Sequence, residues 1–302
     1  MAKKKKEKGE KQGTFNVNYV IGLIGAIVVC AFGMVSKVTL DPEFDIQIQF
    51  GWLIRFFDPA SIFITIGCTV FVIISSFPGS MLKEIPRHLK IITSSGRFNP
   101  IGYIDQLEEL AQAARKEGLL SLENRAGQLE DPFFRSAVML VVDAYDADKI
   151  RSILETDIDN MSARHESVAA MYDKAASVAP AFGMVGTLVG LINMLKSMNL
   201  SGDSQSTLGS DMGTALITTL YGCIMAHMIF SPIATLLRAR DEEEVLCKVI
   251  IIEGVMSIQA GENPKFLRER LMTYVSQADR EGSEEGGKKK KKGKKSKKSD
   301  QE

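Results

Sequence analysis

The amino-acid sequence predicts an all-α integral membrane protein with four transmembrane helices and a cytoplasmic helical domain. Three observations support this fold class. Charged residues are excluded from four stretches, each stretch has the length of a membrane-spanning helix, and the charged residues gather between and after them. Because the chain has 37 basic and 37 acidic residues, the overall balance is uninformative and only the distribution of charge predicts the fold.

The four charge-free stretches are residues 19–35, 59–82, 175–195 and 212–237. With about 17 to 26 residues each, they are long enough to cross a hydrocarbon core about 30 Å thick as helices. A soluble helical protein would have to contain four such runs in one chain, so membrane spans are the better interpretation.

The first stretch follows a lysine-rich segment, so it could be a signal peptide or a retained membrane anchor. A signal peptide ends in small residues at an Ala-x-Ala-like spacing, and residues 36–40, Ser-Lys-Val-Thr-Leu, lack this pattern. We therefore expect a retained first helix.

Lysine and arginine residues at the ends of the stretches predict the orientation. The segment before the first stretch and segment 83–90 after the second are basic, whereas loop 36–55 has only one Lys and one Arg. Arg238 and Arg240 directly follow the fourth stretch, and loop 196–211 is short and polar. Both termini are therefore expected in the cytoplasm.

This topology divides the chain into six parts. They are a Lys-rich cytoplasmic N-terminal tail (1–18), the first two transmembrane helices with a short external loop (19–82), a cytoplasmic helical domain (83–174), the third and fourth transmembrane helices (175–237), cytoplasmic C-terminal helices (238–280) and a Lys-rich tail (281–302). The last part cannot bury enough apolar surface to fold, so we expect disorder. Anionic lipid of the bilayer would attract both lysine clusters, and no folded module supports a nucleic-acid partner.

Capping residues predict where helices of the cytoplasmic parts begin. Asn99-Pro100 and Asp131-Pro132 each place a capping side chain before a proline that the first helical turn tolerates. Apolar residues recur near helical spacing after each start, which predicts a compact helical bundle. A further helix is expected from about Pro264 to Gln277.

Motifs for catalysis are absent from the sequence. The three histidines, His88, His165 and His227, have no partner at metal-ligand spacing, and no phosphate-binding GKS or GKT motif occurs. An enzyme, a resident cofactor and a metal site are therefore not expected.

The third and fourth stretches contain unusual residues for lipid-facing helices. Gly183, Gly186 and Gly190 create a groove that lets another helix approach closely, whether in the same subunit or in another. Thr187 in the third stretch, with Thr218 and Thr219 in the fourth, supplies hydroxyls without a carboxylate. Each hydroxyl could also simply bond to its own helix backbone four residues back.

Together these features resemble the MotA/PomA family of flagellar stator A subunits, within the MotA/TolQ/ExbB proton-channel superfamily. The resemblance covers residues 19–275 and is carried by 57–61 (FDPAS), 114–123 (ARKEGLLSLE), 180–191 (PAFGMVGTLVGL), 218–222 (TTLYG) and 253–264 (EGVMSIQAGENP). Any one of these motifs alone would be a weak indication.

The resemblance implies a subunit of the bacterial inner membrane that forms a ring, expected to be a pentamer, around two B-type (MotB/PomB-like) subunits. The B subunit would supply a membrane Asp, which agrees with charge-free spans that have no ion carrier of their own. Inward flow of sodium or protons, with sodium favoured because Thr187 matches the position typical of sodium-driven stators, would drive a rotor switch protein of the FliG type. The alternative is an ExbB/TolQ-type subunit that energises outer-membrane processes; such proteins have three spans rather than four.

Four further roles follow from the resemblance alone. The family's rotor-facing basic and acidic residues match Arg115 and Glu123, and its two hinge prolines match Pro180 and Pro232. Arg115 and Glu123 would lie about 12 Å apart if one helix carried both, although Gly118 between them could break that helix. Both could also be ordinary solvated charges, and both prolines could be static kinks.

Overall fold

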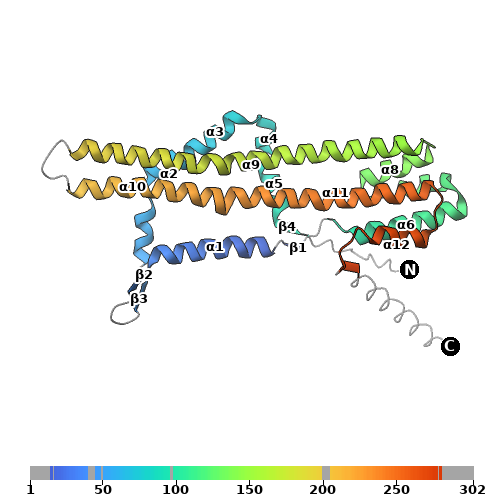
Figure 1. The fold of residues 1–302 in the computed structure, drawn as a ribbon, viewed down its shortest axis with the longest axis horizontal. Coiled ribbons are helices and arrows are strands. Elements are labelled where there is room, and N and C mark those ends of the chain that lie inside the picture. Colours follow the sequence, from blue (N-terminus) through green and yellow to red (C-terminus); the bar gives the residue numbers. More distant parts are fainter. Residues whose placement is uncertain are drawn as a thin grey trace, which may run out of the picture. The chain divides into compact units, whose positions relative to one another are not determined.

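The computed structural model describes residues 14–15, 17–39, 45–48, 50–95, 98–198, 205–277 and 279–280. Contacts between residues divide the chain into two compact units, whose helices and strands are labelled in Figure 1. The membrane unit comprises Met1–Gly96 and His165–Arg240, and the peripheral unit comprises Arg97–Arg164 and Asp241–Glu302. The predicted C-terminal tail, 281–302, lies outside the described residues, as does most of the N-terminal tail.

Short helical segments form the N-terminal part of the membrane unit. They are α1 (Val17–Val35), the 3₁₀ segment η1 (Phe50–Phe56), α2 (Pro59–Ile62), the π-helical segment η2 (Phe63–Gly67), α3 (Cys68–Ser76), α4 (Gly79–Lys83) and α5 (Ile85–Thr93). The second apolar helix therefore ends at Ser76 rather than at residue 82. Phe77 is extended because it precedes Pro78, and a residue before proline disfavours the helical conformation.

Two long helical runs complete the membrane unit. Helix α9 (Ala147–Met198) is continuous, so the boundary expected at residues 174 and 175 is not a break in the helix. The second run consists of α10 (Gln205–Ile224), the π-helical segment η4 (Met225–Phe230) and α11 (Ser231–Gln259). Helices α9 and α11 each contribute residues to both units.

Three helices of the described residues are long and apolar enough to cross a membrane. They contain the second, third and fourth predicted spans. The first span corresponds to the shorter apolar helix Tyr19–Val35. The membrane-spanning class is therefore confirmed, and the count of four spans stays a prediction.

Two small strand pairs were not expected from the sequence. Strand β1 (Thr14–Phe15) pairs with β4 (Ser94–Ser95), and β2 (Ser36–Thr39) forms a hairpin with β3 (Asp45–Ile48). Both pairs are antiparallel and short, and helices dominate the described residues.

The peripheral unit contains α6 (Pro100–Glu117), the 3₁₀ segment η3 (Leu119–Ser121), α7 (Leu122–Ala126), α8 (Pro132–Val142) and α12 (Pro264–Met272), with parts of α9 and α11. The predicted helix starts are confirmed: Asn99 caps α6 and Asp131 caps α8 through their side chains. The helix expected to reach Gln277 ends at Met272 instead.

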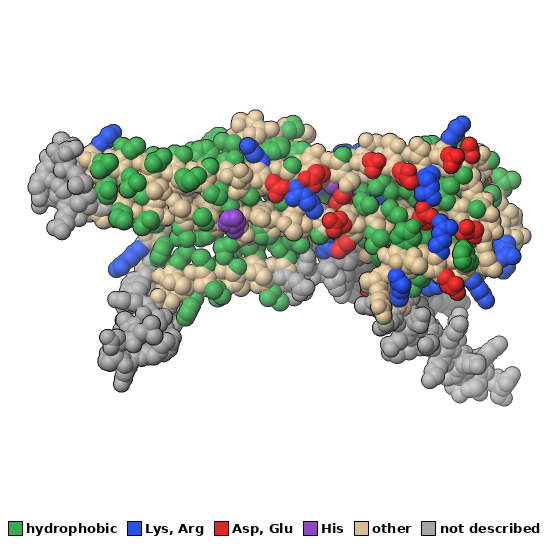
Figure 2. All heavy atoms as spheres, viewed as in Figure 1, with side chains coloured by type: hydrophobic (Ala, Val, Ile, Leu, Met, Phe, Trp, Pro, Cys, Tyr) green, Lys and Arg blue, Asp and Glu red, His purple; other side chains and the backbone are tan. Residues whose placement is uncertain are grey.

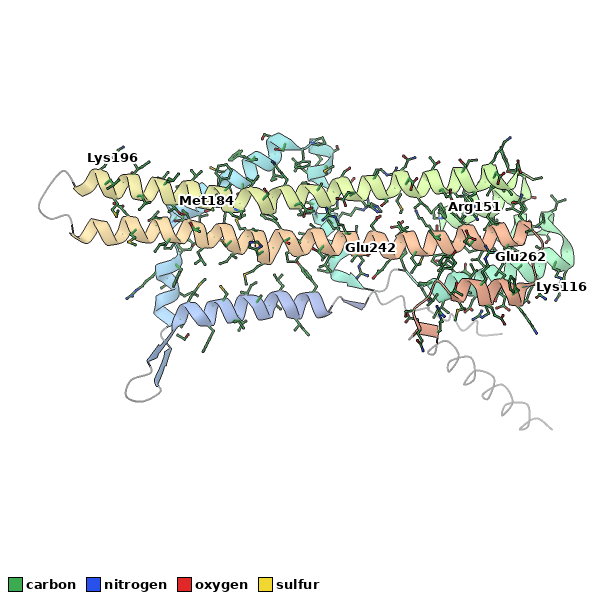
Figure 3. All side chains as sticks on the ribbon, viewed as in Figure 1. Lys116, Arg151, Met184, Lys196, Glu242 and Glu262 are labelled. Carbon is green, nitrogen blue, oxygen red and sulfur yellow. The ribbon has the colours of Figure 1, made fainter. Side chains whose placement is uncertain are left out.

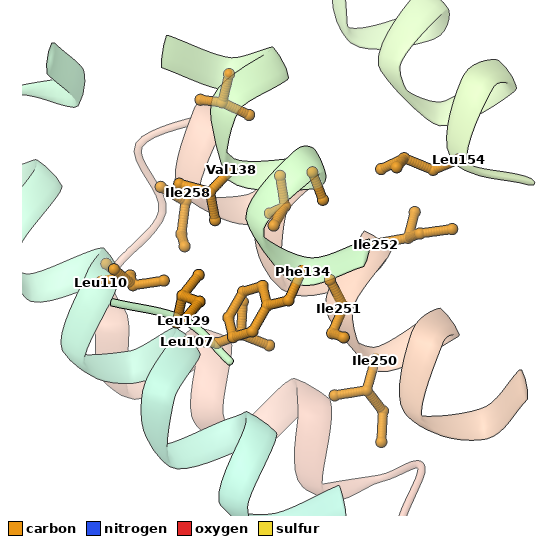
Figure 4. Close-up of a cluster of buried hydrophobic side chains, with 14 of the residues drawn as sticks. Leu107, Leu110, Leu129, Phe134, Val138, Leu154, Ile250, Ile251, Ile252 and Ile258 are labelled. Carbon is orange, nitrogen blue, oxygen red and sulfur yellow. The ribbon is translucent and has the colours of Figure 1, made fainter. Parts of the chain in front are cut away.

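Apolar side chains from these helices form one core (Figure 4). Phe134 of α8 and Leu107 of α6 are fully buried beside Ile250 and Ile251 of α11. A methyl group at Gly254 would lie 2.5 Å from Leu107 Cδ1, so the glycine allows α6 to pack directly on α11. The helices of this unit therefore pack around one shared apolar core.

The surfaces of the two units differ in chemistry (Figure 2). Apolar side chains such as Phe63, Phe71 and Met184 are exposed on the membrane unit, at 76%, 73% and 61%. Charged side chains such as Lys116, Arg151 and Glu262 lie on the peripheral unit (Figure 3). A large exposed apolar surface indicates contact with lipid or with another protein.

Candidate functional site

The three predicted packing glycines lie along the face of α9 that contacts α10. A methyl group at Gly186 would lie 2.5 Å from Thr218 Cγ2, and one at Gly190 would lie 2.7 Å from Ala215 Cβ. One at Gly183 would lie 3.1 Å from the carbonyl oxygen of Thr218. The two helices therefore approach closely within one chain, and the glycines make this approach possible.

Thr218 is the part of α10 that fills this groove. Its side chain is fully buried, and its hydroxyl donates to the carbonyl oxygen of Ala215 at 2.8 Å, with that of Thr214 at 3.2 Å. The residue was predicted for the ion pathway, but its hydroxyl bonds to its own helix and its methyl group lies against Gly186. These contacts are those of a packing residue, and a place for Thr218 on the ion pathway stays a prediction.

Thr187 and Thr219 form the accessible hydroxyl pair of the site. Their oxygens lie 2.6 Å apart, and both side chains are half-buried. The Thr187 hydroxyl also lies 2.9 Å from the carbonyl oxygen of Ala215 and 3.2 Å from that of Gly183. The hydrogen bond to Gly183 stays within α9 and is the structural role that the sequence left open for Thr187. The same hydroxyl also contacts two oxygens of α10, those of Ala215 and Thr219.

The bonding of this pair matters for its chemistry. Each hydroxyl has one proton to donate and two lone pairs to accept with. Because backbone carbonyls of both helices lie within reach, the protons can be directed at Ala215 and between the two hydroxyls. Lone pairs then remain available for a cation, which needs oxygen ligands when it sheds water.

A second row of hydroxyls was missed in the sequence. Ser61, Thr65 and Thr69 are fully buried and succeed one another at four-residue intervals along α2, η2 and α3. Thr65 donates to the carbonyl oxygen of Ser61, and Thr69 to that of Thr65 at 2.6 Å. The i, i+4 spacing in the printed sequence was a usable signal for a polar helix face.

Ser61 connects this row to the fourth span. Its hydroxyl donates to the carboxylate of Asp58, the N-cap of α2, and lies 3.3 Å from the carbonyl oxygen of Thr214 on α10. The hydroxyl of Tyr221 donates to the carbonyl oxygen of Phe56. The start of the second span is therefore bound to α10 at two points.

The two predicted hinge prolines lie at different kinds of position. Pro180 lies inside the continuous helix α9, and a methyl group at Gly222 would be 3.0 Å from Pro180 Cα. Pro232 follows the π-helical segment η4 by two residues. Wider π turns relieve the crowding and the missing hydrogen bond that proline causes in a helix.

Arg115 and Glu123 are exposed residues of the peripheral unit. Arg115 lies in the last turn of α6, whereas Glu123 lies in α7, so the arrangement on one helix does not apply. Gly118 ends α6 with a φ of +83°, a conformation that favours glycine. This turn directs the chain through η3 between the two charged residues.

Within the third and fourth predicted spans, the oxygen atoms that an ion could use as ligands belong to hydroxyls and carbonyls. Residues 175–195 and 212–237 contain no carboxylate. No cluster of three or more His, Cys, Asp or Glu residues that could hold a metal ion occurs in the part of the chain that the structure describes.

Comparisons with known proteins show which family the chain resembles. Residues 125–248 match the MotA/TolQ/ExbB proton channel family. Motility protein A of Borreliella burgdorferi is 42% identical over 225 residues, which are 74% of this chain and 85% of that protein. Chemotaxis protein PomA of Vibrio alginolyticus is 34% identical over 264 residues, 86% of this chain and 96% of that protein.

Solved structures show the same fold. The flagellar MotAB stator complex of Bacillus subtilis has a chain that aligns with a TM-score of 0.75 and 29% identity, covering 86% of this chain and 96% of that one. The C. jejuni MotAB structure aligns with the same TM-score and 24% identity.

Proposed function

We propose that this chain, which belongs to the MotA/TolQ/ExbB proton channel family, is the ion-conducting A subunit of a flagellar stator. The single observation that carries the proposal is its extensive identity to proteins named for motility, 42% with motility protein A of Borreliella burgdorferi. These relatives are named as motility and chemotaxis proteins, and one matching structure is a flagellar stator complex. On this basis the chain is a stator component and not an enzyme.

A second member of the family, the ExbB/TolQ type, is the competing proposal. The extensive matches to motility proteins favour the stator, since PomA of Vibrio alginolyticus aligns over 96% of its length. The apolar helix α1, in addition to the three other candidate spans, is what a four-span subunit requires. Four spans put both termini on the same side of the bacterial inner membrane, and the basic residues that flank the spans assign that side to the cytoplasm.

The ion pathway that we propose runs past the hydroxyls of Thr187 and Thr219. The spans hold no carboxylate, so a B-type subunit has to supply the Asp that carries charge. The MotAB complexes support such a partner. A ring of five A subunits around two B subunits would place each hydroxyl pair next to that carboxylate in turn.

Sodium is the ion that this arrangement favours. A sodium ion has to replace its water shell with oxygen ligands, whereas a proton is carried by neutralising the carboxylate itself. The hydroxyl oxygens of Thr187 and Thr219 lie 2.6 Å apart, beside the carbonyl oxygens of Gly183 and Ala215, and keep lone pairs that their own hydrogen bonds do not use. Thr218 supports this pair by packing against Gly186.

Ion occupancy of the partner has to change the shape of the A subunit for torque to result. Pro180 and Pro232 are the proposed bending points, because each lacks the backbone donor that holds a regular helix. Arg115 and Glu123 of the peripheral unit would then act on a rotor protein of the FliG type through exposed charge.

Rotation in a stator-deleted bacterium tests the proposal. The full chain is expressed with its B-type partner, and rotation of tethered cells is measured while sodium is exchanged for potassium at constant ionic strength. Sodium-dependent rotation is the expected result. Rescue of outer-membrane uptake in a strain lacking its ExbB/TolQ proteins, without rotation, would instead support the competing function.

A further inference from the structure

His88 is a buried titratable residue that the proposed ion pathway does not use. It lies on α5 and is 4% exposed. Its Nδ1 is 3.3 Å from the hydroxyl of Tyr172 on α9, and the two rings meet edge to face at 6.0 Å and 75°. Its Nε2 lies 4.0 Å from the carboxylate of Glu84, which is largely exposed.

The surroundings of His88 connect α5 to the fourth span. Ile92 of α5, Met171 and Tyr172 of α9, and Ile233 and Ala234 of α11 form one buried cluster. The two α11 residues directly follow Pro232. The helix that carries His88 therefore packs on the segment that begins after a proposed bending point.

The contact with Tyr172 is satisfied by a neutral His88 whose Nδ1 accepts a hydrogen bond. A tyrosine hydroxyl has a pKa near 10, so at cellular pH it keeps its proton and can donate it to Nδ1. A neutral imidazole that accepts at Nδ1 carries its own proton on Nε2, on the side of Glu84. A second proton on Nδ1 would turn the Tyr172 hydroxyl from donor to acceptor and would bury a cation.

The charged groups around His88 do not offset the free-energy cost of burying a protonated imidazole. Burial lowers the pKa of His88; Glu84 acts in the opposite direction, and Arg87 adds to the lowering. Around the cluster, α1 contributes the phenol of Tyr19. Arg238 of α11 is held at 2.6 Å by both Glu166 and Asp173 of α9, so these two carboxylates already have a partner.

We propose that His88 positions the α11 segment after Pro232 by holding α5 against Tyr172, and that protonation of His88 releases this hold. His88 thus acts through Tyr172 as a positioning residue. The cellular consequence, a motor that slows when the cytoplasm acidifies, rests on the proposed function and topology.

The sign of the pH effect follows from the lowered pKa. When α5 is separated from α9 (undocked), the imidazole would titrate near its ordinary pKa of about 6.5. When His88 contacts Tyr172 (docked), the imidazole stays neutral to lower pH. The docked form is therefore favoured fully above about pH 6.5 and loses its advantage as the pH falls below that value. Below about pH 6.5, each fall of one pH unit raises the equilibrium constant for the opening of α5, its separation from α9, by up to about tenfold.

Hydrogen exchange of amides in Ile85–Thr93 tests the inference on the purified full chain with its partner. Between a pH of about 7.5 and about 5.5, wild-type opening should rise up to about tenfold after correction for intrinsic exchange. His88→Gln should show no such rise, because its amide oxygen can accept from Tyr172 without titrating. His165→Gln, the same substitution at another cytoplasmic histidine, should respond like the wild type.

Tyr172→Phe keeps the test decisive if His88→Gln does not fold. Removing the phenol removes the hydrogen bond that holds α5 to α9, so α5 should separate from α9 more often at high pH. A His88 that is already released titrates near its ordinary pKa, so the pH response should shrink. An unchanged wild-type response in either variant, or no response in the wild type, overturns the proposal.

Rotation provides the cellular measurement. At fixed external pH and sodium, a permeant weak acid should slow wild-type motors and leave His88→Gln motors nearer their starting speed. Equal slowing of both overturns the regulatory role. A chain that drives no rotation contradicts the proposed function, and the exchange experiment then decides the role of His88 independently.

Discussion

Gly186 of α9 and Thr218 of α10 share a space that has no room for another methyl group. A Cβ at residue 186 would lie 2.5 Å from Cγ2, 2.6 Å from Cβ and 2.7 Å from Oγ1 of Thr218. Thr218 is β-branched and fully buried, so it has little freedom to move aside. The closeness of α9 and α10, and with it the Thr187–Thr219 pair, depends on this contact.

Gly186→Ala should therefore destabilise the membrane unit by about 1 to 3 kcal/mol, the usual cost of overpacking. Thermal unfolding of the purified complex, followed by loss of the monodisperse peak in size-exclusion chromatography, measures the effect. Gly22→Ala is the matched control, because no atom lies within 4 Å of the position of its added Cβ.

Adding Thr218→Ala to Gly186→Ala should restore part of the stability, since it removes the atoms that clash. The two changes are then coupled by about 0.5 to 3 kcal/mol, as expected for residues in contact. Equal losses for Gly186→Ala and Gly22→Ala would show that the close approach of α9 and α10 is absent.

The sequence predicted those features of the fold that depend only on residues close together along the chain. The absence of charge predicted the apolar helices, and Asn99 and Asp131 predicted two helix starts, because capping depends only on neighbouring residues. The π-helical segments η2 and η4 could not be predicted, since they depend on which side chains and helices pack around the backbone.

Predicting the site had a similar limit. The hydroxyl at Thr187 was visible in the sequence, but its contact with Thr219 depends on how α9 and α10 align. Thr218 appeared equivalent to Thr219, and only the position of Gly186 distinguishes the buried residue from the accessible one. Gly118 left open whether one helix carries Arg115 and Glu123, and its positive φ decides against that arrangement.

The proposed topology predicts which surfaces a membrane-impermeant thiol reagent can reach in intact spheroplasts. In a background without the four native cysteines, Ser210→Cys near the start of α10 should be labelled, and Lys149→Cys on α9 should not. Both positions are exposed in the structure, so burial does not explain a difference. Labelling of Lys149→Cys would contradict the cytoplasmic placement of the peripheral unit.

Charge reversal at Arg115 or Glu123 should reduce motility without affecting membrane insertion or copurification with the B subunit. Both side chains are exposed and lie outside the apolar core, so the folded chain tolerates the change. Steering by exposed charges weakens with salt, and added salt in a reconstituted motor should reduce the difference from wild type.

Lys149→Glu is the matched control for these reversals, since Lys149 is also an exposed basic residue of the peripheral unit. Normal swimming speed in soft agar is expected of this control. If both Arg115→Glu and Glu123→Lys swim equally well, alone and combined, the two residues are ordinary solvated charges.

Glu253 should contribute more to the stability of the peripheral unit than an exposed carboxylate such as that of Glu155. Its carboxylate is 13% exposed and pairs with Arg151 at 2.9 Å and with Arg270. Glu253→Gln leaves two half-buried guanidinium groups without this charged partner and should cost about 1 to 3 kcal/mol. Glu155→Gln, at an exposed carboxylate 3.3 Å from the same Arg151, should cost less than about 1 kcal/mol.

Thermal unfolding of the full chain with its partner, at neutral pH and in increasing salt, distinguishes the two variants. The Glu155 contribution should disappear with salt, because exposed pairs are screened, whereas that of Glu253 should persist. Equal sensitivity to salt would mean that the Glu253 pair behaves as an exposed one.

Sodium selectivity should depend on the oxygen of Thr187. Thr187→Ser keeps a hydroxyl near Thr219 and the Ala215 carbonyl, whereas Thr187→Val keeps the shape and removes the oxygen. Swimming speed measured against external sodium, with potassium as replacement at fixed pH, should therefore stay near wild type for Thr187→Ser. For Thr187→Val, the sodium concentration that gives half-maximal speed should rise about tenfold or more, which corresponds to the loss of about 1.4 kcal/mol of ion binding.

Thr218→Ser and Thr218→Val are the matched controls for this series. Because the Thr218 hydroxyl bonds to carbonyls of its own helix, Thr218→Val should lower the amount of assembled complex more than it shifts the sodium dependence. Equal shifts at residues 187 and 218 would place both hydroxyls on the ion pathway. Wild-type speed that does not depend on sodium would mean that protons drive the motor, since a carboxylate needs no oxygen cage to carry a proton.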